Sequence, residues 1–365
     1  MFTRRNWLTS VGGMWGTACA LHAQRGPETG SNTVQTPPME FASIVPNEKR
    51  SLVTVRTGEE RRRIVREALE GIDAEIRKGW KSKKYVLIKP NNVSTQNQLA
   101  STHADTLRGI LDYLDGRWKG PVIIAESSAG QTMDGFENFH YPRLQGEYKR
   151  LQVRLVDLNA ESEYRLTHLL TPDLHVQPVR LAARMLDPES YQICAAILKT
   201  HNTVIATQSV KNMTLGAPLH QKPGETVRWN DKRKYHGGVR QTHYNMFLTA
   251  MKLKPYWGAT VIDGWEGMEG NGPASGTPVA SRAAIASTDY IAADRVGVEL
   301  MGIDPKWIGY LNYCHQNGVG QYDLEKIDVD GPRLSTVAKK YQLHRDIERE
   351  LEWMGPLQEV PPKLG

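Results

Sequence analysis

Four polar or charged side chains stand where short apolar runs end, and their types suit them to chemistry. They are Lys89, Glu126, Lys199 and Asp263. Lysines can hold a phosphate, a carboxylate or a polarised carbonyl group, and neighbouring carboxylates change their proton affinity. If the apolar runs are parallel strands, these side chains lie along one edge of the sheet and converge on a common crevice. The alternative is that one or two of them simply form salt bridges.

Further polar and glycine residues follow the same run ends, and together they predict a site for a small anionic molecule. We expect Lys89, Lys199 and Lys211 to hold the anion, and Asn91 and Asn212 to orient it. The other expected ligand-binding residues are Asn92, Glu126, Ser127, Gly216, Gly264, Gly270 and Gly272. The expected catalytic residues are Lys199, His201, Asp263 and Glu269.

The glycine-rich stretch after Asp263 is the most conspicuous part of this pattern. Residues 259–262 are apolar with β-branched side chains, which predicts a buried strand, and we expect residues 264–276 to form a loop at its carboxyl end. Such loops bind ligands in open α/β sheets. The stretch is not a dinucleotide fingerprint, because Ser275 stands where the third glycine should be. The alternative is a tight solvent-exposed turn.

A divalent metal is a candidate cofactor, with His201, Asp263 and Glu269 as its candidate ligands. His220, His236 and His243 are further candidates, but no histidine pair has a diagnostic spacing, and a lone histidine in a loop is more often a hydrogen-bonded surface residue than a metal ligand. The chain has no C-x-x-C motif, which excludes a cysteine-ligated iron–sulfur cluster within it. Cys194 and Cys314 either form one disulfide, or Cys194 is a free thiol packed in the core.

Short apolar runs alternate with helical patterns, which predicts an α/β fold with a mostly parallel sheet and helices on both faces. The expected strands are residues 85–88, 121–125, 153–157, 193–198, 259–262 and 283–286, with an edge strand at 176–181. The expected helices are residues 57–78, a segment capped by Ser101 or Thr102, and residues 247–254, 290–301 and 337–353.

We expect a single α/β domain over residues 49–330, followed by a C-terminal helical tail over residues 331–365. Residues 217–245 read as a polar insertion without periodicity. The insertion is basic, through Lys222, Arg228, Lys232, Arg233, Lys234 and Arg240. It is either a solvated loop or a lid that attracts an anionic ligand toward the crevice.

The N-terminus predicts export. Residues 1–23 resemble a twin-arginine signal peptide, with Arg4 and Arg5 before apolar residues, and residues 24–48 form a flexible tether. We therefore expect the export machinery as a partner and a periplasmic or extracellular location, with lipid attachment at Cys19 as a weaker alternative. No run reaches the roughly 18 apolar residues of a membrane helix. The net charge of +6 is too diffuse to indicate nucleic acid.

Several of these motifs together resemble the bacterial and archaeal family called "domain of unknown function 362". They are residues 88–91, 199–201, 211–216 and 263–273, followed by 287–289 and 293–294, and the resemblance spans about residues 85–302. The resemblance implies the fold and the site positions but no particular reaction. Several members carry an appended ferredoxin-like cysteine cluster, which this chain lacks.

These observations favour an exported enzyme that acts on a small anion, with a metal or a cofactor loaded before export. The alternative is a non-catalytic ligand- or cofactor-binding protein of the cell envelope with the same pocket. A purely structural envelope protein would bind no small molecule.

Overall fold

The computed structural model describes residues 47–355. The expected signal peptide, nearly all of the expected tether and the last ten residues lie outside this range. Within residues 47–355, no helix combines the length and the apolar character needed to cross a membrane.

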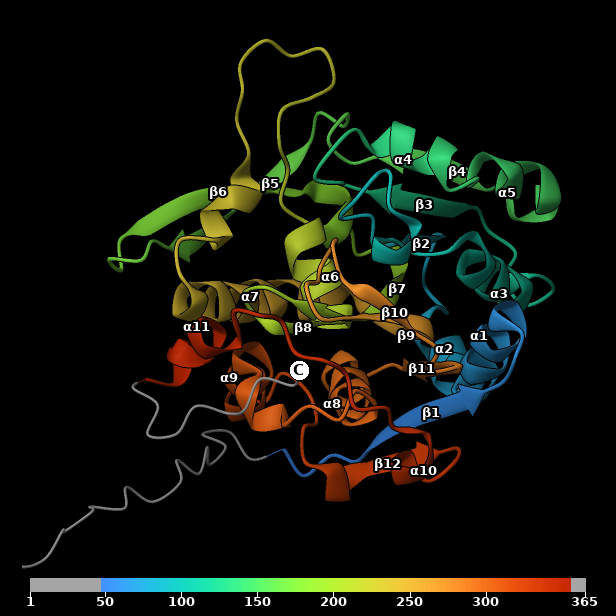
Figure 1. Ribbon diagram of the computed structural model, residues 1–365. Helices are drawn as coiled ribbons and strands as arrows, with labels where there is room; N and C mark the ends of the chain where they lie inside the picture. Colours follow the sequence, from blue (N-terminus) through green and yellow to red (C-terminus); the bar gives the residue numbers. More distant parts are fainter. Residues whose placement is uncertain (1–46, 356–365) are drawn as a thin grey trace, which may run out of the picture. The chain divides into compact units, whose positions relative to one another are not determined.

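A ten-stranded mixed sheet forms the centre of this unit, and its main path runs β12-β1-β11-β9-β7-β2-β3-β4 (Figure 1). Neighbours along this path are parallel except where β11 meets β1 and β9, so the predicted mostly parallel α/β sheet is confirmed. β8 and β10 extend β7 and β9 as antiparallel partners, and β5 and β6 form a separate hairpin. The strands are β1 Ser51–Thr57, β2 Tyr85–Lys89, β3 Val122–Glu126, β4 Arg154–Asp157, β5 Tyr164–Leu170, β6 Val176–Ala182, β7 Ser190–His201, β8 Ile205–Thr207, β9 Trp257–Glu269, β10 Thr277–Val279, β11 Ala283–Ser287 and β12 Ile327–Asp330.

Helices cover both faces of the sheet, as predicted. Side chains alternate between the faces along each strand. Val86 and Ile88 of β2 pack into a core with α1–α5, whereas Leu87 packs into a second core with α6–α9. The helices are α1 Arg61–Glu70, α2 Asp73–Gly79, α3 Ala104–Leu114, α4 Thr132–Asn138, α5 Pro142–Glu147, α6 Ser209–Gly216, α7 Val239–Leu253, α8 Tyr290–Leu300, α9 Gly309–Gln316, α10 Leu334–Val337 and α11 Ile347–Leu351.

Three element boundaries differ from the sequence-based prediction. The helix expected over residues 57–78 is two helices, α1 and α2, and strand β1 precedes them. The loop expected from residue 264 begins later, because β9 continues to Glu269 beside β7 and then β10. The single helix expected over residues 337–353 is absent. As far as Gly355, the tail has the short helices α10 and α11, with non-helical residues between them, and a 3₁₀ turn at Glu352–Met354.

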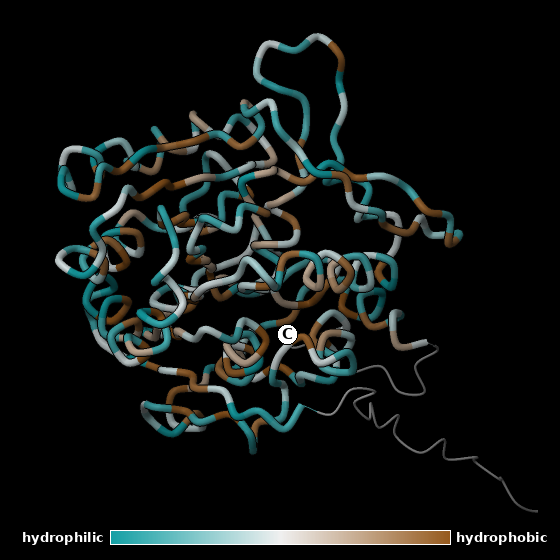
Figure 2. The backbone as a smooth tube through the Cα atoms, turned by 180° about the vertical axis from the view of Figure 1, so that it is seen from behind, coloured by the Kyte–Doolittle hydropathy of each residue, from teal (hydrophilic) through white to brown (hydrophobic). Residues whose placement is uncertain are grey.

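The expected insertion at residues 217–245 is partly helical. Its second part belongs to α7, which begins at Val239. Its first part leads through a short 3₁₀ turn, η4 (Asp231–Tyr235), and is drawn mostly in hydrophilic colours in Figure 2. This connection projects at the top of Figure 1, on the side where β2 and β3 end. It is therefore placed to contribute side chains to the predicted crevice.

Asp289 caps α8 and also ties the first strand to the rest of the domain. Its Oδ1 atom accepts hydrogen bonds from the backbone N–H groups of Ile291 (3.0 Å) and Ala292 (3.2 Å). Its Oδ2 atom accepts from the Ser51 hydroxyl (2.7 Å) and the Gln321 N–H (2.9 Å). We expect Asp289→Ala to lower the free energy of unfolding by about 1–3 kcal/mol, because a cap and two further bonds are lost. Urea unfolding followed by circular dichroism measures this loss.

The matched control is Asp304→Ala, which removes an exposed carboxylate that accepts one backbone hydrogen bond, from Lys306. We expect this variant to lose no more than about 1 kcal/mol. Equal losses in the two variants would show that the links to Ser51 and Gln321 contribute nothing.

Candidate functional site

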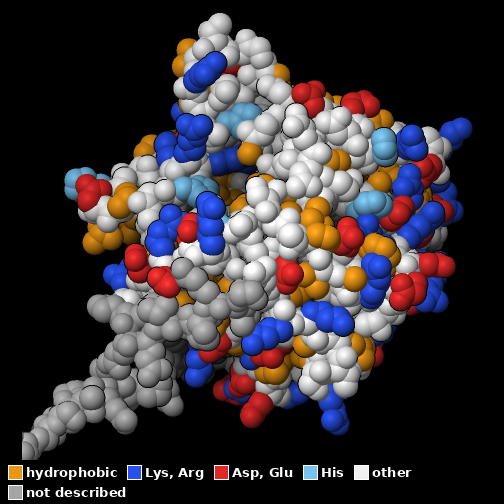
Figure 3. Space-filling model, in the orientation of Figure 1, with side chains coloured by type: hydrophobic (Ala, Val, Ile, Leu, Met, Phe, Trp, Pro, Cys, Tyr) orange, Lys and Arg blue, Asp and Glu red, His pale blue; other side chains and the backbone are white. Residues whose placement is uncertain are grey.

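A cavity of about 410 Å³ opens where β2, β3 and β7 end, between these strands and α6. Nine of the predicted site residues line it: Lys89, Asn91, Asn92, Glu126, Ser127, His201, Lys211, Asn212 and Gly216. The connection between α6 and α7 adds Asn230, Lys232, Arg233 and His236. Figure 3 shows basic and histidine side chains around a hollow beneath this projecting connection. Lys232 and Arg233 are absent from the predicted site, although the basic character of the insertion already indicated them.

The floor of the cavity is a buried ion pair between Lys89 and Glu126. The Lys89 ammonium donates to Glu126 Oε1 (2.7 Å), to Asn212 Oδ1 (3.0 Å) and to the Pro90 carbonyl (2.8 Å). These three bonds use all of its N–H groups. Lys89 is therefore a fixed positive charge with no N–H group left to bind a ligand.

Glu126 is equally occupied. Besides Lys89, its carboxylate accepts hydrogen bonds from the backbone N–H groups of Ser127 (2.7 Å) and Asn92 (3.0 Å). No other carboxylate among the described residues lines this cavity. Glu126 thus acts as the counter-ion of Lys89, and the cavity has no spare negative charge.

Lys199 lies behind the cavity wall rather than in it, which differs from the predicted contact with the ligand. Its Nζ atom donates to Asn91 Oδ1 (2.7 Å) and to the Ala100 carbonyl (2.6 Å). Complete burial lowers the pKa of Lys199 well below the usual lysine value. A neutral amine has two N–H groups, which match these two acceptors. Lys199 therefore positions Asn91, which in turn donates to Asn212 Oδ1 (3.1 Å).

Lys211 is the unusual member of this lysine cluster. Its side chain is only 7% exposed and lines the cavity, yet among the described residues it makes no hydrogen bond or ion pair. Burial, and then the nearby charge of Lys89, lower the pKa of Lys211 to about 7. Burial likewise lowers the pKa of Lys232 to about 7, and that amine donates to the Leu215 carbonyl (2.9 Å).

His201 contributes a hydrogen-bond donor. Its Nδ1 atom accepts from the backbone N–H groups of Thr203 (3.0 Å) and Val204 (3.4 Å), so the ring proton is assigned to Nε2. Burial, followed by the charge of Lys211, lowers the pKa of His201 well below the usual histidine value. The neutral ring therefore offers an N–H group, and an Nε2 atom that carries a proton is not a metal ligand.

Asp263 does not join the cavity. It lies opposite Ile197 in the sheet, while β9 continues for six more residues, so it is not at the strand end. Its side chain forms an ion pair with Arg61 (3.2 Å) and accepts a hydrogen bond from Thr106, under α1 and α3. The predicted convergence of Asp263 with the two lysines and Glu126 is therefore wrong.

The other residues predicted from the glycine-rich stretch are also apart from the cavity. Glu269 and Gly270 line a separate hollow of about 240 Å³, where Glu269 accepts a hydrogen bond from the Gln342 N–H (2.8 Å). Gly264, which is in β9, packs against the side chain of Leu198 in β7. Gly272 packs so closely on β7 that a Cβ atom would lie 2.1 Å from the Thr200 carbonyl oxygen. Gly264 and Gly272 therefore serve close packing, whereas Gly270 has a positive φ of 70°, and of this stretch only Pro273 reaches the cavity.

The candidate metal ligands are not assembled. His243 is a core residue that stacks on Tyr310, and burial lowers its pKa to about 3. His220 lies between the carbonyl groups of Ser128 and Gln221 (both 2.9 Å), and only His201 and His236 line the cavity. Within residues 47–355, no three His, Cys, Asp or Glu side chains are grouped to hold a metal ion.

Both described cysteines are buried free thiols, so Cys194 is the packed thiol of the two alternatives.

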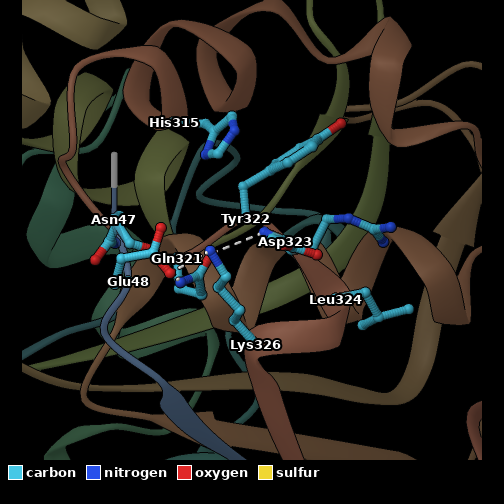
Figure 4. A pocket seen from close by; sticks show the side chains of 9 residues that line it. Asn47, Glu48, His315, Gln321, Tyr322, Asp323, Leu324 and Lys326 are labelled. Atoms are coloured by element: carbon cyan, nitrogen blue, oxygen red, sulfur yellow. Dashed lines mark hydrogen bonds and ion pairs between the residues drawn. The ribbon is translucent and has the colours of Figure 1, made fainter. Parts of the chain in front are cut away.

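A larger hollow, of about 520 Å³, lies between the segment before β1 and the region after α9 (Figure 4). There Lys326 pairs with Glu48 (2.8 Å), and His315 stacks on Tyr322 with ring centroids 5.1 Å apart. The ammonium group of Lys326 is already paired with Glu48, and none of the predicted site residues lines this hollow. The strand-end cavity is therefore the better candidate site.

Gly216 is needed for the Lys89–Glu126 pair, because a Cβ atom there would lie 2.0 Å from Lys89 Cε and 2.3 Å from Nζ. We expect Gly216→Ala to lower the free energy of unfolding by about 1–3 kcal/mol through overpacking, measured by chemical unfolding. The control is Gly146→Ala in α5, where a Cβ atom meets nothing within 4 Å. That variant should be neutral or up to about 1 kcal/mol more stable. A stable Gly216→Ala protein would show that Lys89 can move without loss.

This chain is similar to one solved structure and matches one family model. A crystal structure of a protein from Thermotoga maritima aligns at 11% identity over 57% of this chain and 51% of that one, with a TM-score of 0.33. This chain thus spans about half the length of that protein, and curated proteins contain no match. The family model "Domain of unknown function (DUF362)" matches residues 86–299, which include every residue that lines the strand-end cavity. The chain belongs to this DUF362 family.

Proposed function

We propose that this protein binds a small molecule with an anionic group in the strand-end cavity. The observation that carries the proposal is Lys211, a buried lysine that lines the cavity without a counter-ion or hydrogen-bond acceptor among the described residues. Buried charges are normally paired, so a site that buries an unpaired lysine is suited to a ligand that supplies the missing negative charge.

The surrounding groups favour a carboxylate or phosphate as that negative charge. Lys232, Arg233 and the Nε2–H group of His201 face the same space, while the negative charge of Glu126 is already used by Lys89. Arg233 is exposed at the rim, where a guanidinium can attract and orient an incoming anion. This placement supports the lid interpretation of the basic insertion over a solvated loop.

An enzyme and a non-catalytic binding protein would both use this cavity. The enzyme is favoured by Lys211, because a lysine whose pKa is near neutrality exchanges protons readily at physiological pH. Asp263 and Glu269 have no part in the proposed chemistry, because they lie outside the cavity. Saturable binding of many anions without any turnover would favour the binding protein instead.

Export is a separate proposal, supported by the N-terminal sequence alone. Arg4 and Arg5 precede a weakly apolar stretch, followed by small residues suited to cleavage near Ala20 or Ala23. We propose that the folded protein is exported by the twin-arginine route to the periplasm or the exterior.

We expect Lys232→Met and Arg233→Gln each to weaken binding of inorganic sulfate by roughly tenfold to a hundredfold, because each removes a charged hydrogen-bond donor. Isothermal titration calorimetry at pH 7 measures these affinities. Lys222→Met is the matched control, since Lys222 is exposed in the same connection but does not line the cavity. Its affinity should change by no more than about twofold, because salt screens distant charges. An equal loss in all three variants would mean that the connection acts only through its total charge.

Replacing both Arg4 and Arg5 by lysine should keep the protein inside the cell, because the export signature requires the arginine pair. Immunodetection in periplasmic and cytoplasmic fractions measures the outcome. Arg25→Lys, just after the expected cleavage region, is the control and should be exported normally. Undiminished export of the double variant would refute the twin-arginine proposal without affecting the cavity.

A further inference from the structure

We propose that Lys211 is a nucleophilic amine, which forms an imine with the carbonyl group of a small oxo acid bound in the cavity. This inference rests on the proposed function, because the acid group of the ligand is the anion that the cavity binds. It adds a reacting atom, Lys211 Nζ, and a chemical class of ligand, a molecule with both a carboxylate and a ketone or aldehyde.

The first argument is the hydrogen bonding of the lysines around the cavity. Lys89 donates to three acceptors, Lys199 to two and Lys232 to one. Lys211 has no acceptor among the described residues, although its side chain is only 7% exposed. An amine that no protein group engages remains available to react with a ligand in the space it lines.

The second argument is the electrostatic setting of Lys211. Lys89 is held in an ion pair, because its three N–H groups are bound and its counter-ion Glu126 is fixed by backbone N–H groups. Burial, and then the nearby cation of Lys89, disfavour a second ammonium and lower the pKa of Lys211 to about 7. About half of the protein therefore carries the free amine at neutral pH, and a desolvated lysine beside another cation is a known way to activate this nucleophile.

The third argument is the set of groups that complement an oxo acid. Lys232 and Arg233 can hold its carboxylate, and His201 Nε2–H can donate a hydrogen bond to its carbonyl oxygen. The cavity of about 410 Å³ is large enough for a small ligand. The fixed Lys89–Glu126 pair and its amide neighbours keep the floor of the cavity in place beneath it.

The reaction balances without any other reagent. The Nζ lone pair attacks the carbonyl carbon, so a C–N bond forms while the C=O double bond becomes a C–O single bond. The oxygen then leaves as water and takes both protons of the neutral amine, and a C=N bond remains. No atom changes its oxidation state, and hydrolysis reverses the step.

Reductive trapping tests this inference on the full folded protein. The protein is incubated with pyruvate and sodium cyanoborohydride at pH 7, and modified lysines are located by peptide mass spectrometry. We expect Lys211 to be modified roughly tenfold or more above exposed lysines such as Lys119, because an uncharged amine is the reactive form. Acetate, which has a carboxylate but no keto group, should protect Lys211 by competition.

Lys211→Arg is the matched variant, because it keeps a cation at this position but removes the nucleophile. It should lose the modification, whereas Lys222→Met, outside the cavity, should keep both sulfate binding and the modification of Lys211. Modification of Lys232 in place of Lys211 would overturn the assignment of the nucleophile. Sulfate binding with no trapped product in the unsubstituted protein would overturn the imine and leave the proposed function standing. Absence of both sulfate binding and trapping would overturn the two proposals together.

Discussion

The site depends on one interaction, the buried ion pair between Lys89 and Glu126. These residues end the neighbouring parallel strands β2 and β3, and their side chains meet with less than 4% of either exposed. A buried pair of this kind adds little net stability over apolar residues, but the loss of one partner costs about 3–5 kcal/mol. The pair therefore fixes where the two strands end relative to each other.

Several other features follow from this pair. Asn212 anchors α6 to Lys89, and Gly216 at the end of α6 leaves room for the lysine side chain. Backbone N–H groups of Asn92 and Ser127 hold the carboxylate, so the loops after both strands are tied to the same point. Because Glu126 already pairs with Lys89, the other positive charges that face the cavity have no counter-ion from the residues that line it. A bound anion would supply that counter-ion.

Much of this arrangement could be predicted from the sequence. Lys89 and Glu126 end short, wholly apolar runs, and parallel strand ends share one sheet edge, so their meeting was predictable. Asp263 follows a similar run, but the strand continues through Gly264 and Trp265, and side-chain pattern alone does not show that a strand passes through glycine. Lys199 sits on the correct strand end, but a contact with Ala100, about a hundred residues away in the sequence, holds it behind the wall.

The features that the sequence did not predict either depend on contacts between distant parts of the chain or lie in segments without a periodic pattern. Lys232 and Arg233 have no periodic neighbours, and only the excess of basic residues in their segment indicated a role. Strand β1 pairs with β11 and β12, both more than 200 residues away in the sequence, so no local pattern distinguishes it from the start of a helix. The periodicity of apolar residues thus predicts helices, strands and strand ends. The full set of residues that line the cavity depends on long-range contacts that form only in the folded chain.

The central claim is that the cavity keeps Lys211 and Lys232 partly deprotonated until an anion binds, and proton uptake on binding tests this claim most directly. The measurement is calorimetry of sulfate binding at pH 8 in two buffers of different ionisation enthalpy. Burial holds the pKa values of Lys211 and Lys232 at about 7, so at pH 8 both are mostly neutral, and a bound anion raises these pKa values. The predicted result is net proton uptake at pH 8 that diminishes at pH 6, where both lysines are already charged. Sulfate binding at pH 8 with no proton uptake would contradict the claim.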